Sequence, residues 1–138
     1  MKTTQDIVWQ VREAEGESIT QSSHIAERFS HLSSRCREEF HLVTMNQKNQ
    51  IIDTYLISIG SLTASLVHPR EVFKPAIMDS AAAIMFVHNH PSGDPTPSSS
   101  DKQITKRLKE CGDLLGIRVL DHIIVGKDCY KSDCDGDF

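Results

Sequence analysis

Two histidines and an aspartate near residue 90 are spaced in a way that suits a catalytic metal ion. His88 and His90 are separated by one residue, and residues i and i+2 of an extended backbone project to the same side. The segment 91–97 is too rich in proline and glycine to continue a strand, and the polar run after it predicts the start of a helix. Asp101 falls in the first turn of that helix, where the helix dipole favours a carboxylate. We therefore expect Asp101 to face back toward the histidines as a third ligand.

Two histidines and one aspartate leave the fourth position of a tetrahedral zinc ion open for water, which distinguishes catalytic zinc sites from closed structural ones. Zinc lowers the pKa of bound water to about 7 and polarises a carbonyl, but a neighbouring base must still take and relay the proton. The pattern predicts a single Zn²⁺ site in the chain and requires a glutamate from elsewhere in the sequence.

Other zinc chemistries fit the sequence less well. There is no His-Glu-x-x-His segment, and the four cysteines form no Cys-x-x-Cys pair, so a zincin and a zinc-dependent deaminase are both disfavoured. A two-metal phosphoesterase would need further ligands, for which only Asp121 and His122 offer themselves. That alternative stays open.

The order His-x-His-Pro, six residues, Ser98, two residues and Asp101 resembles the JAMM motif of the MPN/JAB metalloproteases. The stretches 67–71, 88–93 and 120–124 are similar to the JAB domain of bacterial RadC proteins, and the resemblance covers roughly residues 37–132. It implies an α/β fold, a mixed β-sheet flanked by helices in a cytidine-deaminase-like three-layer sandwich. A full-length RadC protein would be expected to carry a helix-hairpin-helix segment before this domain, and residues 1–36 are too short for it. We expect one stand-alone domain over 1–138, ending in a short tail at 133–138.

The resemblance also implies roles for four further positions. In this family the catalytic glutamate lies in a Glu-x-Phe setting on an early strand, which matches Glu38 as general acid/base, while Ser98 would help to hold the oxyanion. Glu39 stays an alternative, because a slip of one residue would turn the other carboxylate toward the site. His122 follows Asp121 within the family pattern, and this pair either orients a metal ligand or forms a structural contact.

The predicted function is a zinc-dependent hydrolase that cuts an amide bond in a peptide or protein, whose identity the fold cannot supply. MPN domains that serve only as scaffolds usually lack some ligands, and none is missing from this motif. The alternative is a non-catalytic interaction module associated with DNA repair or mobile elements, as the RadC resemblance suggests.

Composition restricts the partners. The 138 residues carry 15 basic and 19 acidic side chains, a net charge of -4, which argues against direct nucleic-acid binding. No apolar run approaches the roughly 20 residues of a membrane span, and the N-terminus lacks the apolar core of a signal peptide. We expect a cytoplasmic protein with free cysteine thiols. An exposed Trp9 and an edge strand would permit a homodimer.

Hydrophobic periodicity predicts an alternation of strands and helices. Strands are expected over 7–12, 40–45, 51–59, 65–67, 83–87 and 117–125, and helices from Ser22 or Ser23 to Leu32, over 69–82 and from Asp101 to Gly116. The buried strand 83–87 would deliver His88 at its carboxyl end, where open sheets place their sites. The acidic run 133–137 is expected to fray as a C-terminal tail.

Overall fold

The described part of the chain forms three α-helices, a 3-10 helix and five strands. The structure, a computed structural model, describes residue 14 and residues 16–63 and 67–138. The expected strand at 7–12, Trp9 and most of the strand at 65–67 lie outside these residues. The elements in chain order are α2 (Ser22–Arg28), η1 (Ser30–Ser34), β1 (Glu39–Met45), β2 (Ile51–Ile59), α3 (Pro69–Met78), β3 (Ala83–Asn89), α4 (Ser99–Leu115), β4 (Arg118–Val125) and β5 (Tyr130–Ser132).

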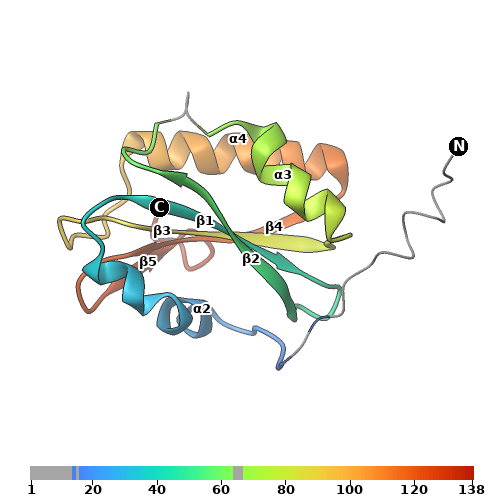
Figure 1. The fold of residues 1–138 in the computed structure, drawn as a ribbon, viewed down its shortest axis with the longest axis horizontal. Coiled ribbons are helices and arrows are strands. Elements are labelled where there is room, and N and C mark those ends of the chain that lie inside the picture. The colour runs from blue at the N-terminus through green and yellow to red at the C-terminus, as the bar shows by residue number, and fades with distance from the viewer. Residues whose placement is uncertain (1–13, 15, 64–66) are drawn as a thin grey trace, which may run out of the picture.

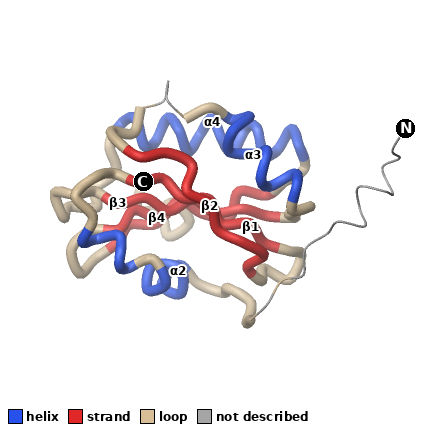
Figure 2. The backbone as a smooth tube through the Cα atoms, viewed as in Figure 1, coloured by secondary structure: helices blue, strands red, loops and turns tan. Residues whose placement is uncertain are grey.

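The five strands form one mixed sheet in the order β2-β1-β3-β4-β5. Neighbouring strands are antiparallel except β3 and β4, which are parallel and are joined by the crossover helix α4. Figure 1 shows α3 and α4 on one face of the sheet and α2 on the other, and the tube in Figure 2 shows the same three layers. The predicted α/β fold, a mixed sheet flanked by helices, is confirmed.

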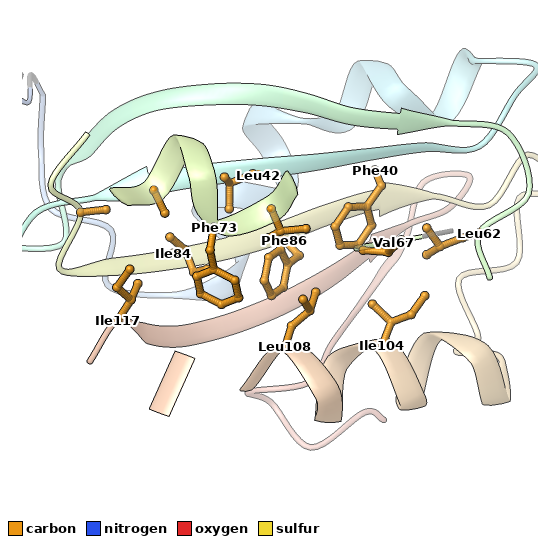
Figure 3. Packing of buried hydrophobic residues seen from close by; sticks show 13 residues of the cluster. Phe40, Leu42, Leu62, Val67, Phe73, Ile84, Phe86, Ile104, Leu108 and Ile117 are labelled. Carbon is orange, nitrogen blue, oxygen red and sulfur yellow. The ribbon is translucent and has the colours of Figure 1, made fainter. Parts of the chain in front are cut away.

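Each face of the sheet has its own apolar core, because successive strand residues point to opposite faces. Phe40 and Leu42 of β1 and Ile84 and Phe86 of β3 pack beneath α3 and α4 (Figure 3). The intervening residues of the same strands pack with α2 and η1 on the other face. All seven residues of β3 are buried, so the strand that leads to the histidines is held on both sides.

Two helices end earlier than their sequences predict. The helix expected over 69–82 stops at Met78, because Ser80 takes a left-handed φ of 51° and the Ala82 amide donates to the Met45 carbonyl of β1. The helix expected to reach Leu32 changes at Phe29 from α2 into the 3-10 helix η1. Leu32 is nevertheless fully buried, so the apolar pattern identified the buried face but not the type of helix.

The expected frayed tail is wrong, because residues 130–138 return to the body of the protein. Strand β5 pairs with β4, and the turn after it is held by a hydrogen bond from the Cys134 amide to Asp121 Oδ1 at 2.9 Å. The Ser22 hydroxyl of α2 donates to the Asp135 carboxylate, and the Phe138 ring lies 5.1 Å from the His122 ring. Among the described helices, none has the length and apolar character that crossing a bilayer requires.

Candidate metal centre

Three elements bring four polar side chains to one end of the sheet. His88 is the sixth residue of the buried strand β3 and lies opposite Phe40 in the antiparallel pair with β1. Glu38 precedes Phe40 by two residues and so projects to the same face. Asp101 lies in the first turn of α4, as predicted, and the helix packs over that face. The ligand atoms of Glu38, His88, His90 and Asp101 all lie within 4.8 Å of one another.

His88, His90 and Asp101 form a triangle of side chains, in which each imidazole Nε2 faces a different oxygen of the aspartate. His88 Nε2 lies 3.1 Å from His90 Nε2 and 3.2 Å from Asp101 Oδ1, and His90 Nε2 lies 3.1 Å from Asp101 Oδ2. A tetrahedral zinc ion with bonds of about 2.0–2.1 Å sets its ligand atoms about 3.3 Å apart. The donor set and its spacing therefore fit one zinc ion with an open fourth position.

Glu38 lies beside this triangle, whereas Glu39 faces the other side of the strand. Glu38 Oε1 is 3.9 Å from His88 Nε2 and 3.7 Å from His90 Nε2, and its other oxygen accepts a hydrogen bond of 3.1 Å from the Leu62 amide. Glu39 instead pairs with His41 at 3.2 Å and with Arg35 at 3.5 Å. The strand register thus turns Glu38, and not its neighbour, toward the histidines.

Asn89, the residue between the two histidines, fixes the backbone on both sides of Glu38. Its side-chain oxygen accepts from the Glu39 amide at 2.8 Å, and its side-chain nitrogen donates to the Arg37 carbonyl at 3.0 Å. The side chain is fully buried and takes the place of a strand partner where β1 begins. The sequence analysis missed this residue, although the alternation of strand residues puts it on the face opposite the histidines.

The loop between β3 and α4 sets the orientation of His90. The Nδ1 atom of His90 lies 2.9 Å from the Asp94 carbonyl oxygen, which can only accept, so Nδ1 carries the proton and Nε2 faces the triangle. The loop itself rests on the turn between β4 and β5, where the Lys127 amide donates to the Gly93 carbonyl at 2.9 Å. A Cβ on Gly126 would lie 2.4 Å from that carbonyl oxygen, so the close approach requires glycine.

Ser98 and Asp101 form a capping box at the start of α4. The Asp101 amide donates to Ser98 Oγ at 3.1 Å, and the Ser98 amide donates to Asp101 Oδ2 at 2.8 Å. This reciprocal pair satisfies two amides at the start of the helix and orients the carboxylate. Ser98 therefore holds Asp101 in place, which is a contact that the sequence analysis did not assign to it.

The charges of the cluster are strongly coupled. Burial alone would raise the pKa of Asp101, but its hydrogen bonds with His88 and His90 outweigh burial and hold the pKa far below its usual range. The same bond to Asp101 raises the pKa of His90 against the opposing effect of burial. Asp101 is therefore a carboxylate at neutral pH, which is the form that a metal ligand requires.

Asp121 and His122 are directed to different parts of the structure. Asp121 accepts hydrogen bonds from the Ser132 hydroxyl at 2.7 Å and the Cys134 amide at 2.9 Å, and it holds the C-terminal turn. His122 lies 2.6 Å from His88, behind the cluster, and desolvation lowers its pKa well below the ordinary value. Neither belongs to the four-residue cluster, and the described residues offer no second metal group for a two-metal site.

The fold and the cluster define an α/β domain of the JAB type with a possible metal-binding group. A family model described as the RadC-like JAB domain matches residues 19–135, and the chain belongs to this family. Curated relatives named UPF0758 protein share 56% identity over 108 residues in Symbiobacterium thermophilum, 53% over 111 in Syntrophotalea carbinolica and 52% over 120 in Geotalea uraniireducens. These alignments cover 78%, 78% and 86% of this chain but 45%, 49% and 53% of the relatives. The chain thus spans about half the length of the curated relatives it matches.

Proposed function

We propose that the chain is a zinc-dependent hydrolase of the JAMM type, acting on an amide bond in a peptide or protein. The observation that carries the proposal is the triangle of side chains formed by His88, His90 and Asp101, whose facing nitrogen and oxygen atoms lie 3.1–3.2 Å apart, with the Glu38 carboxylate beside it. Two-imidazole, one-carboxylate sets are typical of catalytic zinc, because they leave one position open.

The proposed reaction is addition of water to the amide carbonyl, followed by loss of the amine. Bound zinc would supply Lewis acidity, lowering the pKa of water and polarising the carbonyl. Glu38 would take a proton from the attacking water through Oε1 and deliver it to the leaving nitrogen. The Leu62 amide holds the other oxygen of the same carboxylate, so Glu38 keeps one face toward the reacting atoms.

The exposed members of the cluster indicate the side from which a substrate would enter. The His88 and Asp101 side chains are 0% and 1% exposed, whereas those of His90 and Glu38 are 14% and 21% exposed. A scissile amide would therefore approach over Glu38 and His90. The Ser98 hydroxyl accepts from the Asp101 amide, a bond that does not use its own proton, so this hydroxyl could donate to a developing oxyanion.

The proposal is tested by metal analysis and peptide-library cleavage of the wild type and of Glu38→Gln, with Glu39→Gln as the matched control. About one zinc per chain is expected in all three proteins. Cleavage is expected from the wild type and Glu39→Gln and lost in Glu38→Gln, because an amide cannot accept the proton. Metal-free wild type from zinc-replete cells would overturn the proposed zinc site.

A second candidate, the non-catalytic interaction module, is favoured by apolar side chains on the surface. Ile77 and Met78 at the end of α3 and Leu114 and Leu115 at the end of α4 are exposed and line one pocket. Exposed apolar patches of this kind mark interaction surfaces. Such a module needs neither zinc nor Glu38, and a wild type that binds zinc but cleaves no library peptide would leave either this candidate or a substrate outside the library.

A further inference from the structure

Two members of the triangle are joined behind it by a buried chain of hydrogen bonds. His88 Nδ1 lies 2.6 Å from His122 Nε2, and His122 Nδ1 lies 2.6 Å from Thr105 Oγ1. The Thr105 hydroxyl donates to the Asp101 carbonyl one helical turn earlier, at 2.7 Å. The three side chains of His88, His122 and Thr105 are 0–4% exposed. The chain therefore links β3 to β4 and then to α4, ending on the residue that supplies the carboxylate.

The Asp101 carbonyl, at the end of this series of hydrogen bonds, fixes which atom is the donor in each of them. A carbonyl oxygen can only accept, so the single hydroxyl proton of Thr105 is used in the bond to Asp101. The Thr105 oxygen must then accept from His122 Nδ1, which places the His122 proton on Nδ1. In neutral His122 the Nε2 atom is left as an acceptor, and it receives the proton of His88 Nδ1. His88 Nε2, the atom in the triangle, is thereby the nitrogen available to a metal ion.

We propose that Thr105 and His122 are positioning residues, which hold His88 in the Nδ1-protonated form and keep its Nε2 lone pair directed at the metal site. This role rests on the proposed zinc site and goes beyond it, because neither residue is a ligand. Metal-bound histidines commonly donate their second nitrogen to an outer acceptor, and loss of that acceptor typically weakens metal binding about 10–100-fold. Here the outer acceptor is the imidazole of His122. Thr105, two hydrogen bonds away from His88, fixes the His122 proton on Nδ1.

The His122 ring is fully buried and lies among aromatic side chains. The rings of Phe40 and Phe86 stand edge-on to it, with centroids at 5.6 and 6.0 Å, and the Phe138 ring lies 5.1 Å away. His122 is also held in β4 opposite Phe86 of the parallel strand β3. Because His122 is fully buried, the loss of Thr105 as an acceptor would leave its Nδ1 without this hydrogen-bond partner, which is costly.

Thr105→Val and Thr105→Ser separate the hydrogen-bond chain from packing. Valine keeps the side-chain volume and lacks the hydroxyl, whereas serine keeps the hydroxyl and lacks the methyl group. The probe is Zn²⁺ alone, with affinity measured by competition against a chelator, and Thr54→Val on the exposed part of β2 is the control. We expect Thr105→Val to bind zinc about 10–100-fold more weakly, and Thr105→Ser and Thr54→Val to stay near the wild type.

A second measurement does not depend on bound metal. In the metal-free wild type, ¹⁵N chemical shifts of histidine should show the proton of neutral His88 on Nδ1. In Thr105→Val, His122 can carry its proton on Nε2, so His88 should shift toward the Nε2-protonated form, which cannot bind zinc through that atom.

The outcomes distinguish this role from the zinc site itself. Stoichiometric zinc in the wild type, with equal affinity and an unchanged His88 tautomer in Thr105→Val, would overturn the positioning role and leave the zinc site intact. Serine weakening zinc binding more than valine does would assign the effect to packing and also overturn the role. A wild type that takes up no zinc would overturn the proposed function, and the positioning role with it.

Discussion

Asp101 takes part in two features at once, the proposed metal site and the first turn of helix α4. Asp101 is a member of the proposed metal-binding triangle and also the residue that closes the capping box of α4, where Ser98 is its partner. The same two hydrogen bonds therefore contribute to helix stability and to the position of a carboxylate oxygen.

Replacing Ser98 by alanine is expected to impair both functions. Loss of an N-cap hydroxyl costs about 1 kcal/mol of the free energy of unfolding, and it removes the acceptor that orients the first turn around Asp101. Urea unfolding of the zinc-free protein should show that loss, and chelator competition should show weaker zinc binding. Ser98→Thr, which keeps a capping hydroxyl, should change little. Unaltered stability and affinity in Ser98→Ala would contradict the dual role.

Asp121 is expected to give the stability of the protein a measurable pH dependence. Burial raises its pKa, although hydrogen bonds from Ser132, Cys134 and His122 oppose the increase. The unfolded carboxyl releases its proton near pH 4, whereas the folded one retains its proton to higher pH. Folding therefore takes up a proton in that window, and stability falls as pH rises from about 4 through the raised pKa.

The measurement for Asp121 is the free energy of unfolding across that pH window for the wild type and for Asp121→Asn. The difference between the two proteins should change with pH below the raised pKa and become constant above it. Parallel pH profiles would mean that the buried carboxyl titrates as it does in the unfolded chain.

The residues of the triangle were accessible to sequence reasoning because their spacing is local. His88 and His90 follow from strand alternation, and Asp101 follows from its place in a first helical turn. The choice between Glu38 and Glu39 required the register of β1, which no local pattern fixes. Thr105 reads in the sequence as an ordinary helix residue, and its bond to His122 depends on the crossover that lays α4 against β4. The catalytic role of Glu38 stays a prediction.

At the scale of elements, the site depends on how the loop 90–98 rests on the turn between β4 and β5. The His90 amide donates to the Val125 carbonyl at 3.1 Å, and the Gly126 backbone lies against Gly93 and Pro95. These contacts keep Asp94 where its carbonyl can orient His90. The turn thus supports His90, a proposed metal ligand that follows strand β3.

Gly126→Ala is expected to push this loop outward. The new Cβ would lie 2.4 Å from the Gly93 carbonyl oxygen and 2.8 Å from Pro95 Cδ, and overpacking of this kind costs about 1–3 kcal/mol. Thermal or urea unfolding would give the loss of stability, and chelator competition the accompanying loss of zinc affinity. Lys127→Ala, at an exposed neighbour, is the control. If Gly126→Ala had the same stability and zinc affinity as Lys127→Ala, the close approach of Gly126 to the loop would not contribute to either property.

Element boundaries were the least accessible feature of the fold. The helix over 69–78 has an apolar pattern that continues toward residue 82, and it ends because the Ala82 amide is taken by the sheet. Strand β3 continues to Asn89 for the converse reason, since β1 pairs with it as far as His88 and β4 as far as Asn89. In both cases a long-range backbone partner decided the boundary.

At the scale of the whole molecule, the beginning and the end of the described chain are tied together beside the site. Ser22 of α2 contacts both the Asp135 carboxylate and the Tyr130 hydroxyl, the latter at 3.1 Å. Lys109 of α4 pairs with Asp133, and Phe138 lies against His122. The C-terminal segment therefore bridges both helical layers, which an acidic composition alone could not indicate. The layers themselves were predictable, because strand and helix periods alternate along the sequence.

Deletion of residues 133–138 is expected to destabilise the protein by more than about 1 kcal/mol, since several hydrogen bonds worth about 0.5–1.5 kcal/mol each are lost. Urea unfolding of the truncated and full chains measures the difference, and Gln103→Ala, at an exposed position of α4, serves as the control. Superimposable unfolding curves would restore the prediction of a frayed tail.

The residues proposed to bind the metal ion and the residue proposed as the base come from separate parts of the chain. His88, His90 and Asp101 all belong to one continuous unit of strand, loop and helix, whereas Glu38 arrives with the β1–β2 hairpin, which occupies one end of the sheet. Regions of a protein can open locally, so a local opening at the start of β1 would remove Glu38 and leave His88, His90 and Asp101 in place. Zinc content therefore tests only the triangle of His88, His90 and Asp101. The position of Glu38 has to be tested by a separate measurement.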